Sequence, residues 1–312
     1  VQPTVAGGTS VYAGAKTITV KAPHDSGMFY VKYREKDSDT EKEIGIKRDS
    51  ITGPWTSIKP ELGVVTGNST TDGFSDTVTI EMKESIKEGS ISAIANIKQS
   101  GYSSPYNWQA TPVTNDAPTL TPSFQGDKKV VEAGSSLNLT DLVRASDKED
   151  DAQLTRGNGT QVEVVSVNGN TRNKTINTNQ AGRYTVRLKA TDSQGKVSPE
   201  KDVTVEVKPV APTVTPTIGD KVTSTDRTLR GTGIAGAKVK VTINNTALPE
   251  VTVGRDGNWT VNLPRGLNSN HASSQAQLVN KDPLKVTQIV DGIESSETNV
   301  TVAVGEAKVQ PS

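Results

Sequence analysis

Apolar and polar residues alternate along many short segments of this chain. In residues 183–190, Tyr184, Val186, Leu188 and Ala190 are each separated by one polar residue. Because successive side chains of a strand point to opposite faces, this period of two predicts a strand with one buried face. The same alternation recurs in residues 29–33, 78–82, 91–95, 203–207, 239–243 and 300–304.

Turn sequences separate several of these segments. The dipeptides Asp72-Gly73, Asn168-Gly169 and Asp256-Gly257 are typical of the tight turns in β-hairpins. Helical periodicity is weak and is limited to residues 82–87 and 139–143. Many short strands separated by turns predict an all-β fold of Ig-like β-sandwiches, each with about 100 residues.

A short Pro-Thr motif repeats along the chain and predicts where one domain ends and the next begins. It occurs as Gln2-Pro3-Thr4, Ala117-Pro118-Thr119 and Ala211-Pro212-Thr213, and residues 309–312 resemble the opening sequence. Proline stiffens a linker and withholds a backbone donor. We therefore expect three β-sandwich domains arranged end to end, as one part of a longer array. The predicted bounds are 1–116, 117–209 and 210–306, with 307–312 starting the next linker.

Composition narrows the possible functions. The 312 residues carry no net charge, and only 32% are hydrophobic and 4% aromatic. Small, thinly filled cores fit these values, and no basic excess is present to bind nucleic acid. No apolar run reaches the ~18 residues of a membrane span, so we expect no membrane insertion. The chain has no cysteine, which excludes disulfides and thiolate chemistry. It has two histidines, His24 and His271, which lie far apart in the sequence.

Two regions resemble known bacterial modules. In the third predicted domain, Gly231-Thr232-Gly233, Gly236-Ala237-Lys238-Val239 and residues 256–264 resemble the Ig-like domains that occur in tandem on Gram-positive cell-wall surface proteins. In the second, residues 131–135, 145–150, 181–186 and 190–195 resemble an Ig-like or cadherin-like module. Residues 1–116 match no family that we can name.

The array as a whole resembles the stalk or binding region of a large staphylococcal or streptococcal adhesin, such as the giant extracellular-matrix-binding proteins. The resemblance implies an extracellular, monomeric segment, attached to the cell wall through another part of the chain. It also implies a role in adhesion, biofilm or virulence rather than catalysis. A host matrix protein or a glycan is the partner that it suggests.

One group of acidic residues suggests a metal site. The candidates are Asp116, Asp147, Glu149, Asp150, Asp151 and Asp192. Calcium takes six to eight hard oxygen ligands, and cadherin-like modules gather them at a junction between domains. The alternative is a solvated acidic loop, with Asp192 capping a turn. Calcium is the one cofactor that the sequence suggests.

One aromatic segment suggests a ligand site. Tyr102, Tyr106 and Trp108 lie close together in the sequence, and Trp55 follows Gly53-Pro54. If exposed, these rings stack on a sugar or anchor a protein partner. If buried, they close the end of the first sandwich. The two alternatives correspond to two functions: a stalk or adhesion region, and a ligand-binding module on the first domain near residues 102–108.

Two further motifs match catalytic or nucleotide-binding patterns only formally. Residues 231–236 fit the spacing G-x-G-x-x-G, but that motif needs a helix next, and residues 238–243 predict a strand. His24-Asp25-Ser26 contains the residue types of a catalytic triad, but neighbours along an extended chain point apart. We therefore expect neither a nucleotide site nor an enzyme.

Overall fold

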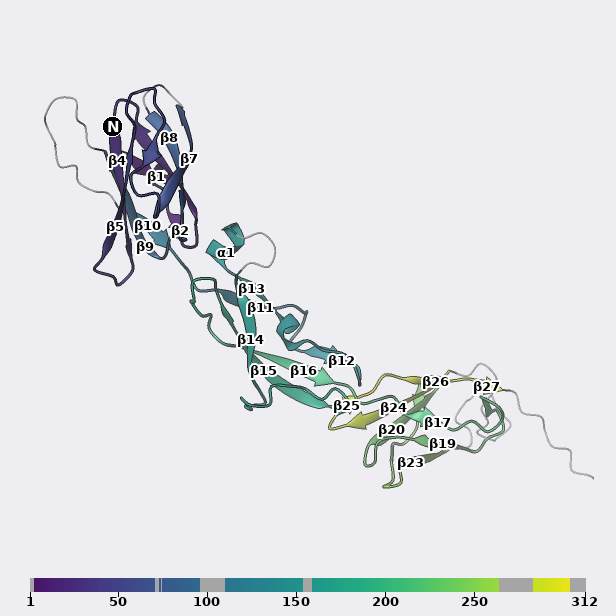
Figure 1. Cartoon of the computed structure of the whole chain (residues 1–312). Coiled ribbons are helices and arrows are strands. Elements are labelled where there is room, and N and C mark those ends of the chain that lie inside the picture. The colour runs from purple at the N-terminus through teal and green to yellow at the C-terminus, as the bar shows by residue number, and fades with distance from the viewer. Residues whose placement is uncertain are drawn as a thin grey trace, which may run out of the picture. The chain divides into compact units, whose positions relative to one another are not determined.

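The structure is a computed structural model whose regular secondary structure consists almost entirely of strands, β1 to β27 (Figure 1). It describes residues 3–70, 73, 75–95, 110–153, 159–263 and 283–303. The all-β prediction is confirmed. Within these ranges the helical elements are two 3-10 turns and one α-helix, and no helix among them is long and apolar enough to cross a membrane.

The chain divides into two compact units. The first comprises Val1–Thr121, Arg144–Glu163 and Lys189–Glu200, and the second comprises Pro122–Val143, Val164–Leu188 and Lys201–Ser312. The predicted middle domain, 117–209, therefore contributes to both units. Its buried residues, such as Val186, Leu188 and Val205, belong to neither of the two large hydrophobic clusters. The division into three domains stays a prediction.

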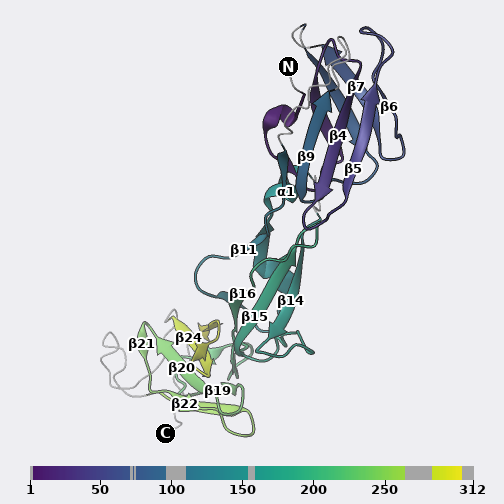
Figure 2. The same cartoon turned by 90° about the vertical axis from the view of Figure 1, so that its left-hand side faces the viewer.

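The N-terminal sandwich, residues 3–114, consists of two sheets. The first sheet has the order β1 (Thr4–Val5), β3 (Thr17–Pro23), β8 (Ser75–Met82), β7 (Gly63–Thr70). The second has the order β2 (Val11–Tyr12), β10 (Thr111–Thr114), β9 (Gly89–Ala95), β4 (Met28–Glu35), β5 (Glu41–Lys47), β6 (Thr56–Ser57). Between β1 and β2 the chain passes from one sheet to the other through the 3-10 turn η1 (Ala6–Gly8). Figure 2 shows β9, β4 and β5 side by side.

The core of this sandwich follows from the alternation in its strands. Val78, Ile80 and Met82 of β8 face Phe29 and Val31 of β4 within one buried cluster. The polar residues between them point outward. The predicted strands at 29–33, 78–82 and 91–95 are thus confirmed.

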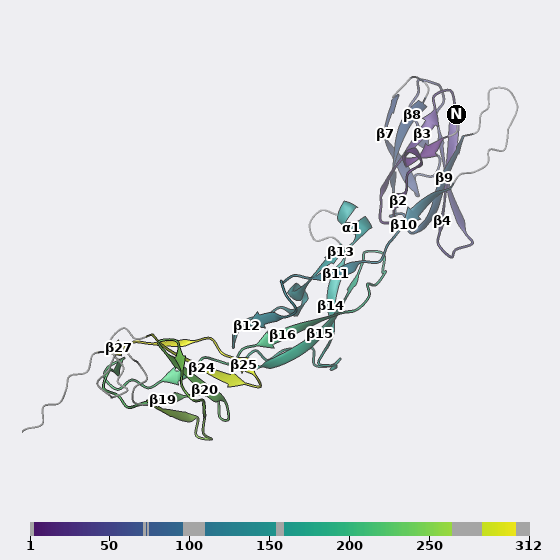
Figure 3. The same ribbon diagram turned by 180° about the vertical axis from the view of Figure 1, so that it is seen from behind.

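The middle region holds a four-stranded sheet and a two-stranded one (Figure 3). The larger has the order β12 (Lys129–Val131), β16 (Lys201–Val207), β15 (Gly182–Thr191), β14 (Gln161–Val167). The smaller pairs β11 (Thr119–Pro122) with β13 (Val143–Ser146). The helical elements are the 3-10 turn η2 (Leu139–Leu142) and the helix α1 (Lys148–Gln153). In β15, Val186, Leu188 and Ala190 are buried, as their alternation predicts.

The C-terminal sandwich, residues 213–303, has three sheets. One has the order β17 (Thr213–Val214), β19 (Thr228–Thr232), β23 (Asn258–Asn262), and another pairs β18 (Val222–Thr223) with β27 (Val302–Ala303). The third has the order β21 (Thr246–Ala247), β20 (Lys238–Ile243), β24 (Leu284–Val290), β25 (Ile293–Glu294), with β22 (Val251–Thr252) beside β20 and β26 (Thr298–Val300) beside β24. A strand, not a helix, therefore follows Gly236, as predicted.

One predicted hairpin is wrong. Asp256-Gly257 does form a turn, closed by the Gly254 N–H donating to the Asn258 carbonyl. However, β22 before the turn pairs with β20, whereas β23 after it pairs with β19. The turn therefore carries the chain from one sheet to another.

Gly231 permits a close approach of three strands in the C-terminal sandwich. It pairs with Val214 of β17 on one side and with Trp259 of β23 on the other. A Cβ atom at this position would lie 1.8 Å from the Thr213 carbonyl oxygen and 2.6 Å from Cζ2 of Trp259. The glycine thus makes room for a buried tryptophan.

One pairing recurs in all three regions. An early strand lies parallel to a late one: β2 with β10, β12 with β16, and β18 with β27. The first and last parts of each region are therefore direct neighbours in a sheet.

Candidate functional site

The acidic candidates gather around α1, in the first compact unit. Asp147 precedes the helix and caps it: its Oδ1 accepts a hydrogen bond from the Asp150 N–H at 2.8 Å. An acidic side chain at this position satisfies a free N–H of the first turn. Asp147, Glu149 and Asp150 are exposed by only 1%, 0% and 1%. The alternative of a solvated acidic loop is therefore wrong for these three residues.

The linker residues Asn115 and Asp116 contact this acidic group directly. The Asp116 N–H donates to Oε1 of Glu149 at 2.6 Å, and Nδ2 of Asn115 donates to Oδ2 of Asp192 at 3.0 Å. Oδ1 of Asp192 accepts from the backbone N–H groups of Gln194 and Lys196. The prediction that Asp192 caps a turn is thus confirmed.

Two long side chains connect the same region to the N-terminal sandwich. Nε2 of Gln153, in α1, donates to the Ala13 carbonyl oxygen at 2.7 Å. Nζ of Lys196 donates to the Asn115 carbonyl oxygen at 2.6 Å and lies 3.4 Å from the Glu88 carboxylate. Together with Asn115 and Asp116, these contacts form what we call the junction.

The six predicted acidic residues have different environments in the junction. Asp147, Glu149, Asp150 and Asp192 are buried, whereas Asp116 and Asp151 are exposed. The Asp150 carboxylate is fully used, because it accepts hydrogen bonds from Thr160, from the Ser193 hydroxyl and from the Ser193 N–H. Asp116 contributes its backbone N–H rather than its side chain.

Three buried oxygens of the junction have no hydrogen-bond donor among the described residues: Oδ1 of Asn115, Oδ2 of Asp147 and Oε2 of Glu149. Leaving a buried acceptor unpaired is costly, and more so for a charged one. The pKa of Asp147 is raised to about 6, chiefly by burial. A hydrogen bond from the Asp150 backbone lowers this pKa, whereas the nearby carboxylates of Asp150, Asp192 and Glu149 raise it. A positive charge at this place would lower that cost.

The chemistry of the three unpaired oxygens fits a hard cation such as calcium, which takes carboxylate and amide oxygens. The positions of these three oxygens fit a bound cation less closely than their chemistry does. No group of three or more Asp, Glu or His side chains in the described ranges is arranged to hold a metal ion. Binding would therefore require the oxygens of Asn115, Asp147 and Glu149 to converge.

Asn115 is a residue of this site that is absent from the predicted candidates. The signal was present in residues 114–118, Thr-Asn-Asp-Ala-Pro, a segment that resembles a cadherin linker. Only the acidic residue of that segment counted as a candidate. The structure places the amide of Asn115, not the carboxylate of Asp116, against the buried acidic group.

Comparisons with known proteins give only distant likenesses. No family model matches the chain, and no curated protein matches it. Among the solved structures, the fibronectin(III)-like modules of Clostridium thermocellum CbhA match at 16% identity and a TM-score of 0.22, covering 66% of this chain and 94% of that one. Domains 1–6 of the surface layer protein SbsC match at 12% identity and a TM-score of 0.20, covering 98% of this chain and 55% of that one. Likeness at this level assigns neither a family nor a function.

The structure corrects the assignment of Trp55 to a ligand site. Its side chain is only 3% exposed and packs edge-on against Phe29, with ring centroids 5.1 Å apart. A ring in this position is part of the core and offers no platform for a ligand. Tyr102, Tyr106 and Trp108 lie outside the described residues, so their role stays a prediction.

Trp55 belongs to a buried polar cluster centred on the Asp76 carboxylate. Oδ2 of Asp76 accepts from Nη1 of Arg48 at 2.5 Å and from Nε1 of Trp55 at 3.1 Å. Oδ1 lies 2.8 Å from Nδ1 of His24 and accepts from the Thr70 hydroxyl at 3.0 Å. Arg48 also donates to the carbonyl oxygens of Ser26, Ile51 and His24 and lies over the Trp55 ring. We call this group the Asp76 cluster; it joins β7 and β8 of one sheet to the loop between β5 and β6 of the other.

Proposed function

We propose that this chain is part of the extracellular region of a bacterial surface protein and has a structural and adhesive role rather than a catalytic one. Tandem Ig-like domains at 1–116, 117–209 and 210–306 would hold a binding region away from the cell wall. They would also offer weak contacts to host matrix or to neighbouring cells.

The junction is the observation that carries this proposal. A flexible linker would leave Asn115 and Asp116 in solvent, but here both are hydrogen-bonded to buried acidic residues. Gln153 and Lys196 add contacts from the following segment back to the N-terminal sandwich. A linker that is fixed on both sides limits bending between domains, which is what a stalk requires.

We further propose that calcium strengthens the junction. Among the described residues, no donor reaches one buried oxygen each of Asp147 and Glu149, and the amide oxygen of Asn115 is a third. A divalent cation among these oxygens would replace the missing donors and offset the repulsion between the carboxylates. Asp192 already contacts Asn115 and would be the fourth ligand.

Labelled protein tests whether the junction limits bending. The chain has no cysteine, so the substitutions Lys47→Cys and Arg172→Cys introduce two unique labelling positions. We expect a narrow distribution of single-molecule energy-transfer efficiencies, and a broader one when Gln153→Ala and Lys196→Ala remove the outer contacts. Equal widths in both proteins would refute the proposal that the junction stiffens the chain.

Calcium binding has a separate test. We expect the full chain to melt at a higher temperature with calcium than with chelator, because a ligand at about 100 times its Kd stabilises the folded state by about 2.7 kcal/mol. Glu149→Gln should abolish this gain, yet be no less stable than the wild type in chelator, since it removes a buried charge. Glu163→Gln, an exposed change of the same kind, should keep the gain. Identical melting of the wild type in both buffers would rule calcium out.

Adhesion is measured with beads that carry the full chain, flowed over surfaces coated with fibronectin, fibrinogen or collagen. Retention above that of beads carrying an unrelated protein would support contact with host matrix. No retention on any surface would remove the adhesive part of the proposal and leave the structural part.

A further inference from the structure

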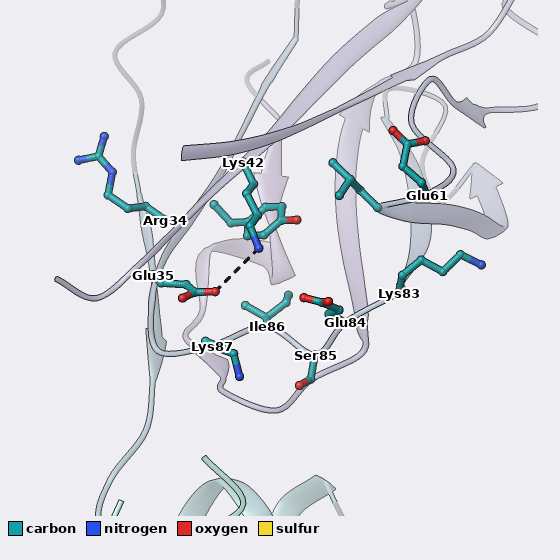
Figure 4. A pocket seen from close by; sticks show the side chains of 11 residues that line it. Arg34, Glu35, Lys42, Glu61, Lys83, Glu84, Ser85, Ile86 and Lys87 are labelled. Atoms are coloured by element: carbon teal, nitrogen blue, oxygen red, sulfur yellow. Dashed lines mark ion pairs between the residues drawn. The ribbon is translucent and has the colours of Figure 1, made fainter. Parts of the chain in front are cut away.

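A cavity of about 200 Å³ lies in the N-terminal sandwich (Figure 4). Strand β4 contributes Tyr33, Arg34 and Glu35 to it, and β5 contributes Lys42. The loop 83–87, which follows β8, closes the opposite side, and residues 61–62 complete it. Of the predicted site residues that the structure describes, none lines this cavity.

One wall of the cavity is apolar. Ile86 is buried at 3% exposure, and Tyr33 and Leu62 are half-buried against the same core cluster. Burial raises the pKa of Tyr33, and the carboxylates of Glu84 and Glu35 raise it further. The phenol therefore keeps its proton at neutral pH and remains a hydrogen-bond donor.

The rim of the cavity carries charges of both signs. Lys83, Lys87, Glu61 and Glu84 form no ion pair within the described part of the chain. In Figure 4 the Glu84 carboxylate points toward the centre, with Ile86 and Ser85 beside it. The pair that does form, Lys42 with Glu35, is long at 4.0 Å.

The arrangement of these charges indicates the kind of ligand. Basic residues (Arg34, Lys42, Lys83, Lys87) and acidic residues (Glu35, Glu61, Glu84) both line the cavity, so neither sign of charge dominates it strongly. A neutral molecule with many hydroxyl groups satisfies both kinds, because each hydroxyl can donate to a carboxylate and accept from an ammonium. The apolar wall suits the C–H face of a sugar ring, and the small volume suits one ring rather than a drug-sized ligand.

We propose that this cavity binds one pyranose ring of a neutral saccharide. The ring lies against Tyr33, Leu62 and Ile86, and its hydroxyls bond to Glu84, to the Tyr33 phenol and to Lys42. The cavity shares no lining residue with the junction, although its loop 83–87 leads into Glu88 and bonds to the backbone of Gly14 and Ala15. It also differs from the predicted ligand site at residues 102–108.

Nuclear magnetic resonance of the full chain tests this assignment. The probes are the methyl glycosides of glucose, galactose, mannose and N-acetylglucosamine, with glycylglycine as a zwitterionic probe. We expect saturable shifts from at least one glycoside, confined to amides of residues 33–35 and 83–87, and unchanged by chelator.

Variants decide whether the named groups hold the sugar. Glu84→Gln and Tyr33→Phe should each weaken binding about tenfold, the change that corresponds to about 1.4 kcal/mol. Glu81→Gln, an exposed change on the adjacent strand β8, should leave binding unchanged. The proposal fails if no glycoside gives saturable shifts, if glycylglycine alone does, or if both pocket variants bind as the wild type does.

Discussion

Asp76→Ala is expected to destabilise the N-terminal sandwich by about 3–5 kcal/mol, the usual cost of removing one partner of a buried ion pair. The substitution leaves the Arg48 guanidinium charged and buried, with a side chain only 3% exposed. It also removes the acceptor for Trp55 and Thr70. Hydrogen exchange of β4 and β8 peptides in the full chain, across a guanidinium series, measures the loss in this sandwich alone.

Asp202→Ala is the matched control for this prediction. Asp202 also pairs with an arginine, Arg187, at 2.9 Å, but both side chains are 48% exposed. Exposed pairs contribute about 0.2–1 kcal/mol. Equal effects of the two substitutions would mean that burial does not decide the strength of the Asp76 cluster.

The effect of Asp76 also depends on pH. Burial raises the pKa of Asp76, but the hydrogen bonds from His24, Trp55 and Thr70 and the charge of Arg48 outweigh it, and the net pKa lies below its usual value. A carboxyl whose pKa is lowered by folding contributes its full stability at pH values above its unfolded-state pKa of about 3.9. This contribution is lost as the pH falls through the folded-state pKa. The difference between the wild type and Asp76→Ala should therefore be complete at pH 7 and shrink only in strong acid.

Gly231→Val is the second change with a large expected effect. A Cβ at Gly231 meets the Thr213 carbonyl at 1.8 Å, and this atom belongs to the backbone of a paired strand and cannot rotate away. Overpacking of this kind separates strands rather than shifting one rotamer. We expect a loss of about 4 kcal/mol or more in the C-terminal sandwich, measured by hydrogen exchange of β19, β20 and β23 peptides.

Arg230→Val is the control on the same strand. Arg230 is exposed, and valine suits a strand, so we expect a change within about 0.5 kcal/mol. If Gly231→Val unfolds at the same denaturant concentration as the wild type, the close approach of β17, β19 and β23 is not a constraint on this fold.

The strands were predictable because their signal is local. Val239, Val241 and Ile243 alternate with polar residues, and all three are buried in β20. The spacing around Gly231 matched a nucleotide-binding motif, but the alternation that follows it excluded the helix that this motif requires. In both cases a few consecutive residues decide the structure.

The site was less predictable because distant residues create it. Trp55 is buried since its indole reaches Asp76, 21 positions later, and Arg48 lies over the ring. The acidic segment 148–153 forms a helix because Asp147 caps it, and its burial depends on the Asn115 linker and the Asp192 turn. Nothing in the local pattern of charges distinguishes this from a solvated loop.

The parallel pairing of early and late strands has a mechanical consequence. When the chain is pulled by its two ends, β12 and β16 are drawn in opposite directions along their common axis. Their three residue pairs, Lys129 with Val205 to Val131 with Val207, then share the load and must break together. A hairpin opened from one end would instead lose its bonds one after another. Tension along the chain therefore loads the pair β12–β16 in shear.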